Sequence, residues 1–366
     1  MSAKPIMAEP ERRAETIYSA NGRIMRTIEK SELLLASLDK QFFFAKGQKR
    51  DIVSSLCGLQ AQFANNPGHA LRIRAADYSN HGWHGGLVKT WTFRGTLHAV
   101  LRDELNLFLS AMGIPESWNE RWGLGKKDMA KWAAHLHGWI REGIVEREEL
   151  KEKCRKKGIT RDVLDIVFHG WGGLIREMCH RGLIAYQSGT AKRFVACDDF
   201  EPGDCESARA EILRRYFRHL GPATLDDCAA FTGFKKSEIA ALLKRRPLPL
   251  ESVVCDGVEY WYMGEWDASG DIPPCLFLSG FDQLLLAYKD RSRLLDDKHK
   301  PDVVTNTGII HPLILLNGRA KAKWEKDGGT ILVTPFAGIS QRNKKRIASF
   351  AKKLFDEDMK EVTFAE

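Results

Sequence analysis

Hydrophobic positions along the chain repeat one arrangement three times: helical periodicity first, then two short β-rich runs around a glycine. The three copies occupy residues 31–126, 127–206 and 207–272. Helices followed by a β-hairpin are the order of a winged helix-turn-helix. We therefore expect an α+β protein with three tandem winged-helix units.

Residues 207–272 carry the clearest local signals. Thr224 can cap a helix over residues 226–232, and Gly233 can end that helix with left-handed backbone. Asp256-Gly257, between two alternating runs, predicts a tight hairpin. In the second unit we expect helices over residues 131–142, 145–156 and 163–180 and a wing at residues 188–193.

Residues 273–366 turn to β-rich patterning and form the predicted C-terminal region. Strands are expected over residues 275–281, 302–305, 309–316, 319–324 and 330–335, followed by a basic helix over residues 341–355. At the other end, residues 1–30 are poorly patterned and interrupted by Pro5 and Pro10. We expect them to form an N-terminal tail.

Composition narrows the class of protein. The 366 residues include 56 Lys and Arg against 48 Asp and Glu, a net charge of +8, which suits a polyanionic partner. The eight cysteines are scattered with no C-x-x-C pair, so we expect reduced thiols and neither a zinc site nor a disulfide framework. The sequence shows no signal peptide and no apolar run near twenty residues, which predicts a cytoplasmic protein, nucleoid-associated if bacterial.

Familiar catalytic motifs are missing from the sequence. It contains no P-loop, no dinucleotide-binding glycine fingerprint, no H-E-x-x-H, no G-x-S-x-G and no zinc deaminase signature. His81 and His84 lie in a glycine-rich stretch that we expect to be a loop. We therefore expect neither a cofactor nor a metal.

Two glutamines two residues apart are the most unusual chemical feature. Gln60 and Gln62 would diverge on a regular helix but share a face where the chain is extended. Asn65-Asn66-Pro67 follows and favours departure from a helix. From the residues alone, solvated or capping amides remain an alternative to a functional pair.

Four motifs in order give this pair a context: Leu59-Gln60-Ala61-Gln62, Thr92-Phe93-Arg94-Gly95-Thr96-Leu97-His98, Leu220-Gly221-Pro222-Ala223-Thr224, and the run from Gly280-Phe281-Asp282-Gln283 to Asp290-Arg291. Together they resemble the winged-helix DNA glycosylases typified by AlkZ and YcaQ. The resemblance spans nearly all of residues 31–335. The second residue of the pair, Gln62, is Asp in the YcaQ branch. Because it is Gln here, the chain is more similar to the AlkZ branch.

The resemblance implies a C-shaped molecule whose basic concave cleft holds duplex DNA. It implies that Gln60 and Gln62 are catalytic, orienting a water in a monofunctional glycosylase that removes cationic alkylated purines. N7-alkylguanine and N3-alkyladenine are the expected lesions, and bulky or crosslinked adducts are a reasonable extension. A β-hairpin in the cleft is expected near residues 303–309, with the wing at residues 188–193 as the competing choice.

Eight residues are our candidates for DNA contacts: Arg72, Arg74, Arg94, His98, Lys192, Arg193, Asn306 and Thr307. For Arg94 and His98 the alternative is that they brace the first wing. For Asp282, Asp290 and Arg291 we favour a structural ion-pair network over the cleft rim. We expect a monomer; a noncatalytic winged-helix transcriptional regulator, dimeric and specific for a palindrome, is the alternative function.

Overall fold

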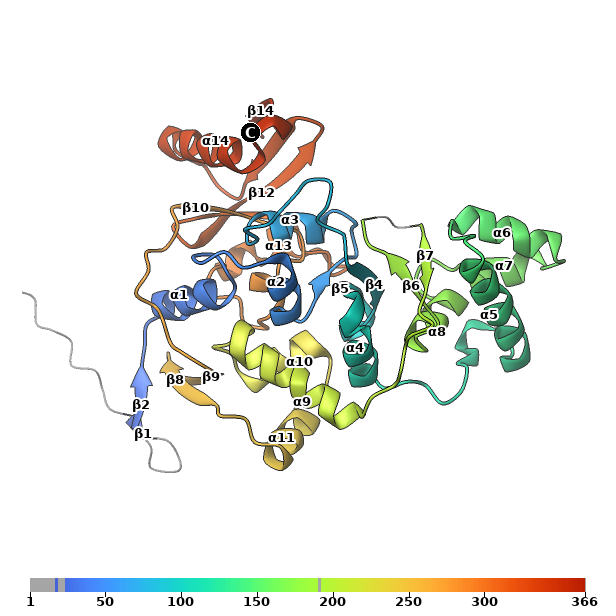
Figure 1. Ribbon diagram of the computed structural model, residues 1–366. Helices are drawn as coiled ribbons and strands as arrows, with labels where there is room; N and C mark the ends of the chain where they lie inside the picture. The colour runs from blue at the N-terminus through green and yellow to red at the C-terminus, as the bar shows by residue number, and fades with distance from the viewer. Residues whose placement is uncertain (1–16, 19–23, 190–191, 366) are drawn as a thin grey trace, which may run out of the picture.

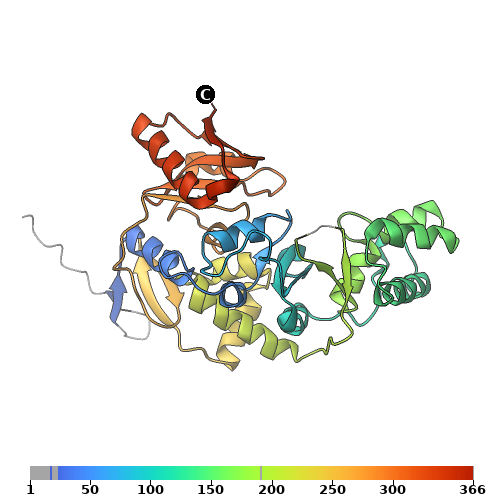
Figure 2. The same ribbon diagram turned by 45° about the horizontal axis from the view of Figure 1, so that its top comes forward.

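The computed structural model describes residues 17–18, 24–189 and 192–365, which form three separate β-sheets surrounded by helices (Figure 1). The strand orders are β1-β2-β8-β9, β3-β5-β4-β6-β7 and β10-β11-β12-β13-β14. Helices α5, α6 and α7 project at one end of the molecule, and α14 lies with the C-terminal sheet at another edge; the turned view in Figure 2 agrees.

The first repeat, residues 31–126, supplies three of the five strands of the second sheet. Its elements are α1 (Lys30–Lys40), α2 (Lys49–Ser55), β3 (Leu59–Gln60), α3 (Asn66–Arg72), β4 (Leu87–Trp91), β5 (Leu97–Leu101) and α4 (Leu105–Met112). Strand β5 pairs antiparallel with both β3 and β4. Strand β4 also pairs with β6 of the second repeat, so one sheet joins the two repeats.

The second repeat differs from its prediction in one helix. Its elements are α5 (Lys126–Arg141), α6 (Arg147–Lys156), α7 (Arg161–Val167), α8 (Gly173–His180), β6 (Ile184–Gln187) and β7 (Phe194–Ala196). The single helix predicted over residues 163–180 is wrong, because it ends at Val167 and restarts at Gly173. Gly173 has φ +61°, and a Cβ there would lie 1.9 Å from the Ile166 carbonyl oxygen, so the chain turns where only glycine fits.

The third repeat follows its local signals closely. Its elements are α9 (Cys205–Arg215), which continues in a π-helical turn, then α10 (Leu225–Thr232), α11 (Lys236–Arg245), β8 (Glu251–Cys255) and β9 (Val258–Tyr262). Thr224 accepts the backbone N–H of Asp227 as the predicted cap, and Gly233 ends α10 at φ +77°. The hairpin turns at Asp256-Gly257, as predicted, with both residues at positive φ.

The C-terminal region is β-rich with a closing helix, as predicted. Its elements are β10 (Cys275–Leu278), α12 (Gln283–Leu286), α13 (Lys300–Val303), β11 (Leu313–Leu316), β12 (Arg319–Asp327), β13 (Thr330–Pro335), α14 (Gln341–Phe355) and β14 (Glu361–Phe364). The strand predicted over residues 302–305 is wrong. Pro301 lies in the first turn of α13, a position that suits its fixed φ and missing N–H, and the helix ends at Val303.

Part of the predicted N-terminal tail belongs to the fold. Strand β2 (Ile24–Thr27) pairs in parallel with β8 and antiparallel with β1 (Ile17–Tyr18), and α1 already begins at Lys30. The tail prediction is therefore wrong for residues 17–18 and 24–30. Residues 1–16 and 19–23 lie outside the described residues.

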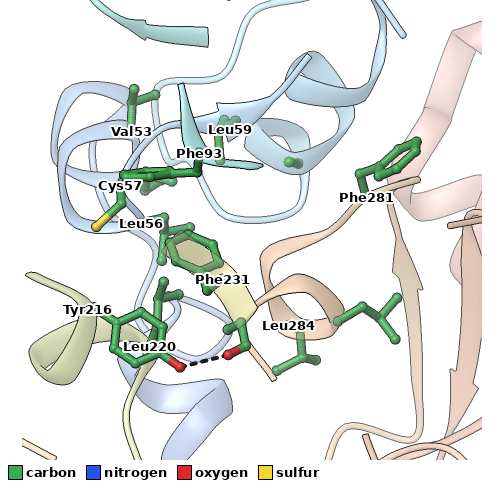
Figure 3. Close-up of a cluster of buried hydrophobic side chains, with 14 of the residues drawn as sticks. Val53, Leu56, Cys57, Leu59, Phe93, Tyr216, Leu220, Phe231, Phe281 and Leu284 are labelled. Carbon is green, nitrogen blue, oxygen red and sulfur yellow. Dashed lines mark hydrogen bonds between the residues drawn. The ribbon is translucent and has the colours of Figure 1, made fainter. Parts of the chain in front are cut away.

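One hydrophobic core crosses the predicted unit boundaries. Leu56 and Phe93 from the first repeat, Phe231 from the third and Leu284 from the C-terminal region belong to the same buried cluster (Figure 3). The second repeat has a separate core, which includes Leu136 but also takes in Trp91 of β4. Because the first repeat, the third repeat and part of the C-terminal region share a core, they position one another.

Candidate active site

The backbone is extended at Gln60, which ends β3, and Gln62 lies in the bend that follows. After α2, Cys57 and Gly58 have positive φ and turn the chain into β3. A Cβ on Gly58 would lie 3.0 Å from Val100 and 3.1 Å from the Ala99 carbonyl, so this turn needs glycine. Gln60 then pairs with His98 across the sheet, and the Ala61 N–H donates to the Leu97 carbonyl over 2.8 Å.

Gln60 is held by an arginine from the turn between β4 and β5. Its side chain is only 5% exposed, and its Oε1 accepts a hydrogen bond from Arg94 Nη2 over 2.8 Å. A second Arg94 nitrogen donates to the Phe231 carbonyl of α10. Part of the Arg94 residue is exposed to solvent, but protein atoms surround most of its guanidinium. This loss of hydration lowers the pKa of Arg94 to about 10, and the nearby charge of Arg291 contributes to the shift. Arg94 therefore remains a cation at neutral pH.

Gln62 leaves an acceptor free. Its side chain is partly buried, and its Oε1 is buried with no hydrogen-bond partner among the described residues. The neighbouring Phe63 is 49% exposed, and its ring lies 5.9 Å from that of Phe281. Gln60 thus has a charged partner, and the chain reaches the surface at Phe63, one residue beyond Gln62.

The turn that carries Arg94 is a meeting point of all three repeats. A Cβ on Gly95 would lie 2.7 Å from a guanidinium nitrogen of Arg176 in α8. A Cβ on Gly233, at the end of α10, would lie 3.2 Å from the Arg94 backbone nitrogen. Two glycines at positive φ therefore let the second and third repeats approach this turn closely.

A side chain of the C-terminal region holds the turn that leads into β3. Gln283 of α12 is buried, and its Nε2 donates to the Gly58 carbonyl over 2.5 Å and to the Leu56 carbonyl over 3.4 Å. Gln283 thereby holds the turn that leads into β3. Three of the four motifs singled out in the sequence are thus linked around Gln60, through Arg94 and Gln283, and the third motif precedes α10, which supplies the Phe231 carbonyl.

Comparisons with known proteins show the family to which the chain belongs. Residues 53–356 match the family described as DNA glycosylase AlkZ-like. The chain belongs to this family.

A curated relative and a solved structure both come from Streptomyces sahachiroi. The relative, named "Interstrand DNA cross-link repair glycosylase", is 24% identical over 335 residues, which cover 82% of this chain and 88% of the relative. The structure of the DNA glycosylase AlkZ superimposes with a TM-score of 0.74 at 21% identity, covering 93% of this chain and all of the other. The AlkZ-like resemblance is therefore confirmed: the chain is a DNA glycosylase, which disfavours the regulator alternative.

Two of the candidate DNA contacts are wrong for this AlkZ-like glycosylase. Arg74 is completely buried, and its guanidinium donates to both carboxylate oxygens of Asp282 over 2.9 and 2.6 Å. His98 is also completely buried, with Nδ1 2.8 Å from the Thr92 hydroxyl. Burial lowers the pKa of His98 to about 3, with the charge of Arg94 contributing, so the ring is neutral. Neither side chain can reach a phosphate.

Arg72 is tied to the C-terminal region. It donates to the Asp358 carboxylate over 2.9 Å and to the Leu354 carbonyl over 3.2 Å. It also lines a pocket of about 450 Å³ between α3, β12 and α14, to which Asn65, Asn66 and Trp83 contribute. Asn65, the pocket residue nearest to Gln62 in the chain, follows it by three residues. The sequence analysis did not predict this pocket.

Four other candidates are accessible. Lys192 and Arg193 are exposed beside the tip of the β6–β7 hairpin, and Arg193 pairs with Glu146 over 3.0 Å. Asn306 and Thr307 are exposed in a loop closed by a bridge between Val304 and Ile310. Residues 190–191 of the predicted wing lie outside the described residues.

The acidic and basic residues of the last motif have structural roles. The charge of Arg74 and its hydrogen bonds hold the pKa of Asp282 below the usual range, although burial alone would raise it. Asp290 accepts from Ser292, and Arg291 donates to the Leu285 carbonyl over 3.0 Å. The favoured structural ion pair is confirmed for Asp282, whereas Asp290 and Arg291 make the hydrogen bonds just described.

The described residues also bear on metal and membrane binding. Among them, no three His, Cys, Asp or Glu side chains are grouped so that they could hold a metal ion. All eight cysteines are free thiols, and all except Cys205 are buried. Within the same residues, no helix has the length and apolar character needed to cross a bilayer.

Proposed function

We propose that this AlkZ-like enzyme is a monofunctional glycosylase that hydrolyses the N-glycosidic bond of cationic alkylated purines in duplex DNA. Gln60 and Gln62 orient the attacking water. The observation that carries this proposal is the environment of the two amides, in which Gln60 is bound by Arg94 while the Gln62 oxygen is buried and has no hydrogen-bond partner among the described residues.

Neutral amides suffice for this class of lesion. Alkylation at guanine N7 or adenine N3 makes the base cationic, so it can leave without protonation by a general acid. The water oxygen forms a bond to the sugar C1′ as the C1′–N bond breaks. The bonding pair passes to the purine and neutralises it, and the attacking oxygen releases one proton to solvent. The protein contributes by orienting water and stabilising the oxocarbenium-like transition state.

DNA binding is proposed to use three tandem winged-helix units around a basic concave cleft. The exposed Lys192, Arg193, Asn306 and Thr307 come from two hairpin regions and are the candidate contacts. Affinity would come mainly from phosphates, without sequence preference, and would fall as salt rises. The enzyme is proposed to act as a monomer.

The proposed substrate range extends to bulky adducts and interstrand crosslinks. A crosslink repair enzyme is the named function of the S. sahachiroi relative, whose length this chain largely covers. Cationic N7 and N3 linkages in such adducts share the weakened glycosidic bond of simple methylated purines. The chemistry assigned to the glutamine pair therefore applies to them unchanged.

Release of free base from a duplex containing N7-methylguanine tests the proposal. Gln60→Ala plus Gln62→Ala should abolish release while DNA affinity is retained, because the two amides act on the water. Gln341→Ala, at the exposed start of α14, is the matched control and should behave as wild type. Unchanged release by the double variant would refute the proposal.

Two further readouts define the reaction. The abasic strand should stay intact until alkali is added, and borohydride should trap no covalent adduct, since no lysine attacks the sugar. Uracil should be excised poorly because it leaves as an anion. Robust single-turnover excision of uracil would contradict the restriction to cationic bases.

A further inference from the structure

The contact with Arg94 makes the two glutamines chemically different. A guanidinium only donates hydrogen bonds, so the Gln60 atom that faces Arg94 must be the carbonyl oxygen. The Gln60 NH₂ group is thereby left to donate elsewhere. Gln62, in contrast, has its carbonyl oxygen unpartnered among the described residues and can accept.

We propose that Arg94 is a positioning residue that fixes Gln60 as a hydrogen-bond donor, while Gln62 serves as the acceptor for the attacking water. This inference rests on the proposed glycosylase function. Gln60 N–H would donate to one lone pair of the water, and the water would donate one hydrogen to Gln62 Oε1. The second lone pair then faces C1′.

The surroundings of Arg94 hold it in place for this task. Its backbone is left-handed, with φ +56°, and Gly233 packs against its backbone nitrogen. A second nitrogen bonds to the Phe231 carbonyl, and the guanidinium carbon lies 5.5 Å from the centre of the Phe231 ring. Because α10 supplies these contacts, the orientation of Gln60 depends on the third repeat.

A phosphate contact is the competing role for Arg94, because its side chain is exposed. The two roles differ in whether Arg94 acts through Gln60. A positioning residue loses its effect once the Gln60 amide is gone, whereas a phosphate contact weakens DNA binding whatever stands at residue 60.

A double-mutant cycle separates these roles, with wild type, Arg94→Met, Gln60→Ala and the double variant. Methionine keeps the length of the side chain and adds no new demand on the left-handed backbone. Single-turnover release of N7-methylguanine at saturating enzyme should fall about tenfold in Arg94→Met, the change that 1.4 kcal/mol produces. In the Gln60→Ala background the same substitution should change the rate less than twofold.

DNA affinity measured over a salt series is the second readout. The slope of log affinity against log salt should be the same in Arg94→Met as in wild type. The inference would be overturned if Arg94→Met slowed base release by the same factor with and without Gln60, and if it also made the salt slope of DNA affinity about one unit smaller. Arg94 would then be a phosphate contact. Arg94→Lys, which can still donate once, should recover part of the rate.

The asymmetry of the pair has its own test. Gln62→Glu keeps an acceptor and should retain activity within about tenfold of wild type. Gln60→Glu has no N–H to donate and should lose as much as Gln60→Ala; the reverse order would refute the assignment.

Unfolding in urea provides a readout that needs no activity. The four proteins of the cycle should show coupling between Arg94 and Gln60, and purely additive midpoint shifts would contradict the hydrogen bond. A wild type that releases no base would refute the proposed function, and the unfolding cycle would still decide whether Arg94 holds Gln60.

Discussion

Replacement of Arg74 by methionine should destabilise the fold severely and leave DNA binding unchanged. Both Arg74 and Asp282 have completely buried side chains, joined by hydrogen bonds of 2.9 and 2.6 Å. Arg74 also donates to the carbonyls of Gln41 and Ala70, so the substitution leaves several buried acceptors unpaired. Breaking one partner of a buried pair costs about 3 to 5 kcal/mol.

The second partner shows where that cost originates. Asp282 caps α12 through the Leu284 N–H and accepts from the Ser279 hydroxyl. Asn at residue 282 can keep the cap without a charge, so Arg74→Met plus Asp282→Asn should be more stable than Arg74→Met alone. Urea unfolding followed by tryptophan fluorescence measures the difference.

A neighbouring arginine provides the matched control. Arg72, the last residue of α3, forms an ion pair with Asp358, whose side chain is 40% exposed, so Arg72→Met should cost about 1 kcal/mol. A loss of stability in Arg74→Met no larger than in Arg72→Met would refute the cost assigned to the buried ion pair. A lower salt dependence of DNA binding in Arg74→Met would contradict the burial of Arg74, since a buried guanidinium cannot neutralise a phosphate.

Further predictions concern pH, backbone and charge. His98 has a pKa of about 3 in the fold and about 6.5 in the unfolded chain, so its contribution to the free energy of unfolding is complete above pH 6.5 and falls as acid protonates the unfolded chain. His98→Asn should therefore remove about 2 kcal/mol of the stability that wild type loses between pH 7 and pH 5, as measured by urea unfolding at each pH. Gly233→Ala should cost about 1 to 2 kcal/mol and slow base release by displacing Arg94, with DNA affinity retained; unchanged kinetics would argue against that coupling. Lys192→Ala plus Arg193→Ala should lower the salt slope of DNA binding by about two, and an unchanged slope would remove this hairpin from the interface.

Local signals in the sequence were sufficient for much of the secondary structure. The cap at Thr224, the left-handed end of α10 at Gly233 and the turn at Asp256-Gly257 depend on interactions within a few residues, and all three were predicted. The same holds for the boundaries of α14 and for the extended backbone at Gln60. The family motifs added the interpretation of Gln60 and Gln62 as a pair.

Long-range contacts decided the rest. Arg72 and Arg74 are two residues apart, yet Arg72 lines a pocket and Arg74 is buried. Arg74 is buried because the fold brings it against Asp282, which lies 208 positions away in the chain. The partner of Gln60 is 34 residues distant, in a turn held by the third repeat. Periodicity shows which positions are apolar, but the fate of a charged or amide side chain depends on which distant group faces it. Only the packing of the three repeats and the C-terminal sheet determines that.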